Sequence, residues 1–128
     1  MISLLEQLKN FDHNYLTIHD IEKLLYSGEN MNQKDEYGNT LLIYAIKYTN
    51  IDCVELLLKF DIDPNITNND GISPLLCAVK NENISIILLL LTYNIKYKFI
   101  EECLSYSIKN NKPNISNLLL DDIYKKYN

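Results

Sequence analysis

Two stretches that lie 33 residues apart decide the fold of this chain: residues 35–45, DEYGNTLLIYA, and residues 68–78, NNDGISPLLCA. Each stretch begins with turn-forming residues around a glycine and reaches a hydroxyl side chain, Thr40 or Ser73, before an apolar run. Thr and Ser are favoured N-cap residues, and Pro74 suits a first helical position because no N–H is needed there. Each stretch therefore predicts a tight turn that leads into a short helix.

The same spacing continues on both sides of these stretches, so the chain has an internal repeat. A period between about 20 and 50 residues is the signature of a stacked array. We expect the turn-led helices at 41–48 and 74–81, and second helices at 51–59 and 84–92, where apolar residues recur on one helical face. Residues repeated at intervals of 33 include Ile18, Ile51 and Ile84, and also Leu24, Leu57 and Leu90.

At these residues the chain resembles the ankyrin repeat family, whose unit opens with a DxxGxTPLHxA motif, continues with a VVxLLL core and closes with a GADPN-like turn. The corresponding residues read DEYGNTLLIYA at 35–45, VELLL at 54–58 and DIDPN at 61–65. The resemblance implies an all-α fold, an ankyrin-repeat solenoid of stacked helix-turn-helix units with short β-turn fingers.

The chain departs from the family motif at positions that affect stability. Ile43 and Leu76 replace the motif's histidine, so we expect fewer hydrogen bonds between turn and helix and a modestly stable array. Asp61 and Asn94 stand where a glycine would end the second helix. Asp and Asn tolerate a left-handed backbone better than most residues, so we expect that conformation at both positions.

The resemblance predicts a single ankyrin-repeat domain over residues 1–128, with about four repeats. The first repeat is degenerate, with an irregular helix expected in residues 1–16, and the last has no glycine turn and a shortened finger. Terminal units that depart from the pattern cover the apolar faces of an array. The expected boundaries are a capping repeat at 1–33, regular repeats at 34–66 and 67–99, and a capping repeat at 100–128.

Composition narrows the classes of function. Twelve basic side chains, all of them lysine, against seventeen acidic ones give a net charge of −5. This balance argues against nucleic acid and anionic membrane as partners. The lack of arginine also removes the side chain most used to clamp phosphate and carboxylate groups.

The cysteines Cys53, Cys77 and Cys103 are widely spaced, lie among apolar residues and form no CxxC pair. We expect buried, reduced thiols and hence a reducing compartment. The amino terminus shows no signal-peptide pattern, and the longest apolar stretch, 84–91, is shorter than the ~20 residues that span a bilayer. The expected location is the cytoplasm.

No residues form a recognisable catalytic, cofactor-binding or metal-binding pattern. Both histidines, His13 and His19, lie in the irregular first repeat, Cys53 is expected to face the core, and no cysteines and histidines have zinc-ligand spacing. We therefore expect no enzyme activity, no cofactor and no metal. An enzyme with an unrecognised site stays a remote alternative, which would need a deep cleft gathering a histidine with cysteine or carboxylate groups.

The resemblance implies that a partner protein is held by the finger tips and the exposed side of the first helices, which together form a concave face. Tyr37, Tyr48 and Ile72 are the expected anchors, because large amphipathic rings and an exposed aliphatic anchor fit the chemistry of binding hot spots; alternatively, they only cover neighbouring turns. Leu88 is expected to point outward and either to pack on the last repeat or to mark a second apolar patch. The expected partner-binding residues are Glu36, Tyr37, Asn39, Lys47, Tyr48, Asn69, Asp70, Ile72, Lys80 and Asn81.

Our leading hypothesis is a non-catalytic protein–protein interaction module. A second hypothesis makes it a pathogen-encoded ankyrin protein that sequesters or redirects a host factor in the host cytoplasm. This alternative rests on composition, because frequent Asn and Ile and the absence of Arg are consistent with an AT-rich genome.

Overall fold

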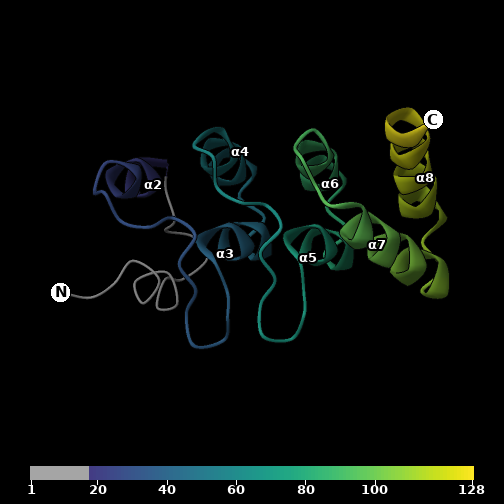
Figure 1. The fold of residues 1–128 in the computed structure, drawn as a ribbon, viewed down its shortest axis with the longest axis horizontal. Coiled ribbons are helices and arrows are strands. Elements are labelled where there is room, and N and C mark those ends of the chain that lie inside the picture. The colour runs from purple at the N-terminus through teal and green to yellow at the C-terminus, as the bar shows by residue number, and fades with distance from the viewer. Residues whose placement is uncertain (1–17) are drawn as a thin grey trace.

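The computed structural model describes residues 18–128, which fold into seven helices and no strand, arranged in two layers (Figure 1). Within a layer, each helix contacts the following helix of that layer, except that α8 is separated from α6. Between the layers, each inner helix packs on the outer helix that follows it in the chain. The predicted all-α solenoid of stacked helix-turn-helix units is confirmed. The inner layer holds α3 (Leu41–Lys47), α5 (Pro74–Lys80) and α7 (Tyr97–Lys109); the outer layer holds α2 (Ile18–Leu25), α4 (Ile51–Lys59), α6 (Ile84–Leu91) and α8 (Pro113–Tyr127). The irregular helix expected in residues 1–16 lies outside the described residues.

The inner helices begin at the predicted caps. Thr40 Oγ1 accepts a hydrogen bond from the Ile43 N–H at 3.3 Å, and Ser73 Oγ accepts one from the Leu76 N–H at 3.1 Å. Pro74 is the first residue of α5, as expected. Helix α4 has its predicted bounds, and the other three regular helices end one residue earlier than predicted.

The outer helices have asparagine caps. The Oδ1 atoms of Asn50 and Asn83 accept hydrogen bonds from the N–H groups of Cys53 and Ile86, both at 3.1 Å. An amide side chain satisfies a helix N-terminus as well as a hydroxyl does, so the repeat has two capped helices.

Left-handed backbone occurs immediately before these caps, at Thr49 (φ 53°) and Glu82 (φ 54°), and again at Asn111 (φ 55°). The expected left-handed residue Asp61 is confirmed, with φ 60°, whereas Asn94 does not adopt this conformation. The chain around Asn94 instead turns through the Ile95 N–H, which donates to the Tyr93 carbonyl at 2.9 Å.

The apolar core runs through every described helix as a row of thin layers. Val54, Leu57 and Cys53 of α4 are fully buried, and the other two cysteines are buried as well. Ile51 was expected on the same buried face but is 38% exposed, because it is the first residue of its helix and Cys53 fills the core position.

Two fingers, at 35–39 and 68–72, project from the inner helices away from the outer layer (Figure 1). In the first, Asp35 Oδ1 accepts hydrogen bonds from the N–H groups of Tyr37 and Asn39, both at 2.9 Å. In the second, Asn68 Oδ1 accepts from the corresponding N–H groups of Asp70 and Ile72, both at 3.0 Å. Each finger is therefore closed by the side chain of its own first residue.

The two fingers are also joined to each other. The Asn69 N–H donates to the Tyr37 carbonyl at 2.9 Å, and Asn69 Nδ2 donates to the Glu36 carbonyl at 2.8 Å. Gly38 lies directly under this contact with φ +75°, and a Cβ placed on it would lie 2.6 Å from the Asn69 nitrogen. Gly38 is thus required twice, for its backbone conformation and for the approach of the second finger.

Asparagine side chains join the repeats a second time, in the turns that follow the outer helices. Asn32 Oδ1 accepts from the Asp63 N–H at 2.9 Å, and Asn65 Oδ1, one period later, accepts from the Lys96 N–H at 2.9 Å. Asn65 Nδ2 also donates to the Asn94 carbonyl at 2.9 Å. These bonds connect each turn to the next in the array.

The last repeat differs from the prediction. Helix α7 begins at Tyr97, so it crosses the boundary expected at residue 100. Its added turns carry the buried residues Phe99, Ile100 and Cys103, and they take the place of a finger. A helix therefore stands where a shortened finger was expected, because apolar residues at helical spacing replace the turn residues of the earlier repeats.

Candidate functional site

The expected binding residues occupy the two fingers and the carboxyl-terminal ends of α3 and α5. We call the exposed and half-buried members of this set the finger face: Glu36, Tyr37, Lys47, Tyr48, Asn69, Asp70, Ile72, Lys80 and Asn81.

Tyr37 is the most prominent side chain of the finger face. It is 60% exposed, yet its N–H is bonded to Asp35 and its carbonyl accepts from Asn69, so its backbone is fixed on both sides. A large ring on a rigid support loses little entropy when it binds. Tyr37 is therefore well placed for contact with another molecule.

Asn39 does not belong to this face, although we expected it there. It is 5% exposed, and its Oδ1 accepts a hydrogen bond from Asn68 Nδ2 at 3.1 Å. The second finger covers it. Its side chain stabilises the contact between fingers and is not available to a partner.

The second finger presents polar side chains and one apolar one. Asn69 and Asp70 are exposed at the tip, whereas Ile72 is half-buried against the core. The edge of this finger that faces α7 is open, because a Cβ on Gly71 would meet nothing within 4 Å. No third finger therefore covers Gly71 in the described part of the chain.

The inner helices add tyrosine and lysine side chains. The rings of Tyr44 and Tyr48 lie 6.2 Å apart, and Lys47 Nζ lies 5.8 Å from the centroid of Tyr44. Lys80 Nζ lies 5.6 Å from the ring centroid of Tyr106, on the next inner helix. Ammonium groups at this distance are attracted by the faces of the rings.

Tyr44 and Tyr106 were missed by the sequence reasoning. Tyr44 is buried, and its hydroxyl donates a hydrogen bond to Asp35 Oδ2 in the first finger. Burial and this bond raise the pKa of Tyr44 to about 12. Tyr44 and Tyr106 lie three positions before Lys47 and Lys109, and this shared spacing is the signal that could have identified them.

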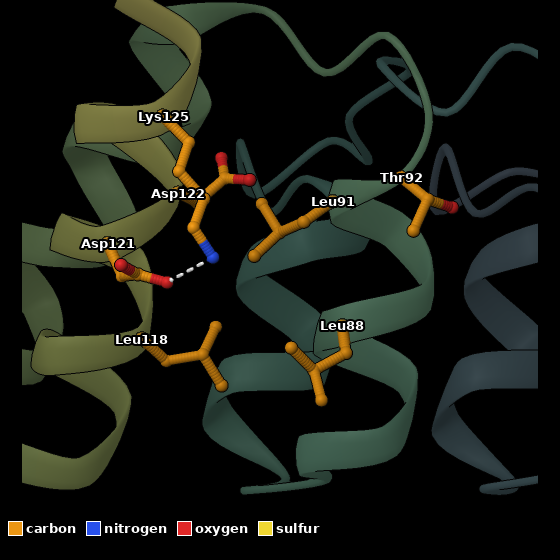
Figure 2. A pocket seen from close by; sticks show the side chains of 7 residues that line it. All are labelled: Leu88, Leu91, Thr92, Leu118, Asp121, Asp122 and Lys125. Atoms are coloured by element: carbon orange, nitrogen blue, oxygen red, sulfur yellow. Dashed lines mark ion pairs between the residues drawn. The ribbon is translucent and has the colours of Figure 1, made fainter. Parts of the chain in front are cut away.

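Leu88 lies in a shallow groove between α6 and α8, where the outer helices diverge (Figure 2). Leu88 is 50% exposed and faces the groove with Leu118 of α8, so it points outward as expected. Lys126 Nζ closes one end by donating to the Leu91 carbonyl at 2.7 Å. The groove, of about 180 Å³, is lined by Leu88, Leu91, Thr92, Leu118, Asp121, Asp122 and Lys125.

The groups considered for catalysis are not brought together in the described part of the chain. His19 is exposed on α2, and His13 lies outside the described residues. Burial raises the pKa of the Cys53 thiol to about 11 and that of Cys103 to about 12, which opposes formation of a nucleophilic thiolate at neutral pH. The groove between α6 and α8 and the cavities of about 250 and 230 Å³ beside it have no histidine or cysteine in their walls.

Residues 18–128 contain no cluster of histidine, cysteine, aspartate and glutamate side chains suited to a metal ion. None of the helices in the same range has the length and apolar character needed to cross a bilayer.

Comparison with known proteins points to one family. Residues 13–101 match a family model described as ankyrin repeats, in three copies. A stretch of 46 residues, 36% of this chain, is 41% identical to an ankyrin repeat protein of Acanthamoeba polyphaga mimivirus. The match spans 11% of that relative's length.

Proposed function

This chain belongs to the ankyrin repeat family, and from that membership we propose that it binds a partner protein through the finger face. Ankyrin repeats are generally protein-interaction modules, and members of the family are typically not enzymes. The observation that carries the proposal is Tyr37, an exposed ring on a finger held by hydrogen bonds at both of its backbone groups.

Three residues act as anchors in this proposal: Tyr37 on the first finger, Ile72 on the second and Tyr48 at the end of α3. Tyrosine is one of the residues that supply most of the binding energy in protein interfaces, and Ile72 adds an apolar contact beside the two rings. The exposed polar residues around them form the rim, which excludes water and sets specificity more than affinity. The rim consists of Glu36, Lys47, Asn69, Asp70, Lys80 and Asn81.

The test begins with affinity capture and mass spectrometry to obtain a partner, followed by measurement of its dissociation constant. A Tyr37→Ala, Tyr48→Ala double variant is expected to weaken binding at least about thirtyfold, the effect of losing one hot spot. A Tyr26→Ala, Tyr124→Ala double variant removes two exposed rings from α8 and the turn after α2, and should bind normally. Unchanged affinity in the first variant would refute the finger face.

We also propose, as a second candidate, that the chain is a viral ankyrin protein that sequesters or redirects a host factor in the host cytoplasm. The match to a mimivirus protein and the Asn- and Ile-rich, arginine-free composition support this reading. Three buried free thiols support a reducing compartment. Capture from host-cell extract that returns only proteins of the source organism would count against it.

A further inference from the structure

A row of lysines crosses the ends of the three inner helices. Lys47 of α3, Lys80 of α5 and Lys109 of α7 each lie in the last turn of their helix and are exposed. They recur at intervals of 33 and 29 residues, so they occupy the same position in successive units. We call these three residues the lysine row.

Aromatic and sulfur side chains line the row. Each lysine follows Tyr44, Cys77 or Tyr106 by three positions, so it lies beside that side chain on the helix surface. Lys80 bridges two units, because its Nζ lies over the ring of Tyr106. Burial raises the pKa of the Cys77 thiol, and the positive charges of Lys47 and Lys80 act in the opposite direction.

The charges of the row are not neutralised within residues 18–128. None of the three lysines forms an ion pair with a residue in this range. Helices α3 and α5 contain no acidic residue, and the acidic pair of α7, Glu101 and Glu102, lies in the half of that helix away from Lys109. The nearby carboxylate of Glu82 is held by Lys112 at 2.9 Å. In a chain with a net charge of −5, the row is a local positive strip.

From this geometry we propose that the lysine row binds an acidic, extended segment of a partner protein, with carboxylates about three residues apart. The inference rests on the finger-face function and specifies the chemistry of the partner. Packed helices lie about 8–10 Å apart. Three residues of an extended segment in the polyproline II conformation complete one turn and cover about 9 Å, so carboxylates three residues apart lie on one side of the segment and meet successive lysines. Tyr48, beside Lys47, offers an aromatic surface at the end of the row.

The charge pattern favours a protein segment over nucleic acid. The finger tips carry Glu36 and Asp70, which repel a continuous polyanion but accommodate a segment whose charges are spaced and confined to one side. The row also lacks arginine, the residue best suited to phosphate.

The test uses a synthetic peptide of about twelve residues with glutamate at every third position, labelled for fluorescence anisotropy. The comparison probes are the same peptide with glutamine in place of glutamate, a peptide with its glutamates contiguous, and a single-stranded oligonucleotide of similar length. We expect binding by the spaced acidic peptide that weakens as salt is added, and little binding by the glutamine peptide.

A Lys47→Gln, Lys80→Gln, Lys109→Gln variant should weaken binding of the acidic peptide about tenfold or more, since each exposed charge pair contributes a few-fold. The matched control, Lys59→Gln, Lys98→Gln, Lys125→Gln, removes the same charge from exposed sites elsewhere and should bind nearly normally. Equal losses in both variants, no binding of the acidic peptide, no preference for spaced over contiguous glutamates, or tighter binding of the oligonucleotide would each overturn the proposal.

A captured partner separates this inference from the function on which it rests. If binding of the partner is weakened by the Tyr37→Ala, Tyr48→Ala variant but not by the triple lysine variant, the finger-face proposal holds and the acidic-segment proposal is wrong. If neither variant weakens binding of the partner, both proposals are wrong.

Discussion

Substitution of the two finger glycines should separate backbone strain from contact between repeats. Gly38 and Gly71 occupy equivalent positions 33 residues apart and have almost the same conformation, with φ +75° and +76°. Alanine in this left-handed conformation costs about 1–2 kcal/mol at either position. Any difference between the two variants therefore reports on their surroundings.

The surroundings differ in one respect. A Cβ on Gly71 meets nothing within 4 Å, whereas one on Gly38 lies 2.6 Å from the backbone nitrogen of Asn69. The second finger must then move away and lose its two hydrogen bonds, from Asn69 to the carbonyls of Tyr37 and Glu36. Each such bond contributes about 0.5–1.5 kcal/mol, so Gly38→Ala should lower the free energy of unfolding by about 2–5 kcal/mol and Gly71→Ala by about 1–2 kcal/mol.

The assay is urea unfolding of the wild type and both variants, followed by far-UV circular dichroism. An Asn69→Ala change combined with Gly38→Ala should recover only part of the loss, because it removes the side chain of Asn69 but not its backbone nitrogen. Equal destabilisation by Gly38→Ala and Gly71→Ala would refute the reasoning, since it would show that contact between the fingers contributes nothing.

Three further changes test other parts of the structure. Thr49→Gly should raise the free energy of unfolding by about 1 kcal/mol in urea titrations, because a β-branched residue is strained at φ 53°; a loss would show that its side chain outweighs the strain. The pKa of Tyr44 is raised to about 12 from 10.0, so the folded chain holds this proton more tightly than the unfolded chain, and the resulting stability is present below about pH 10 and is lost toward pH 12. Tyr44→Phe should therefore make the free energy of unfolding depend less on pH between about pH 10 and pH 12, as measured by urea unfolding at a series of pH values. If the dependence of this free energy on pH is the same in the variant, the pKa of Tyr44 is not raised. Leu88→Glu should change stability by no more than about 0.5 kcal/mol because Leu88 is half exposed, whereas Leu90→Ala, at a fully buried neighbour, should cost about 2–5 kcal/mol in the same assay.

The sequence predicted the features that depend on local chemistry. The hydroxyl caps at Thr40 and Ser73, the bounds of α4 and the turn glycines follow from short-range preferences repeated in register. Repetition strengthens such a prediction, because the second copy tests the first.

Features that depend on the neighbouring repeat were missed. Asn39 reads as an exposed turn residue, but it is covered by Asn68 of the next finger, and nothing in its own repeat indicates this. No bounds were predicted for helix α7, because the spacing changes from 33 to 29 residues and the turn residues used for alignment are absent. The same change of spacing concealed the lysine row, since Lys109 falls out of the 33-residue register.

The asparagine hydrogen bonds in the turns after the outer helices affect how repeats can be added to this chain by gene duplication. The block 34–66 contains both Asp63, whose N–H is bound by the preceding Asn32, and Asn65, whose Oδ1 binds the following Lys96. If this block were duplicated in tandem, Asn65 of one copy would face the equivalent of Asp63 in the next at the native separation. Each new repeat would thus carry both the donor and the acceptor of the hydrogen bonds between repeats. Gene duplication could then lengthen the array without a compensating mutation where two repeats meet.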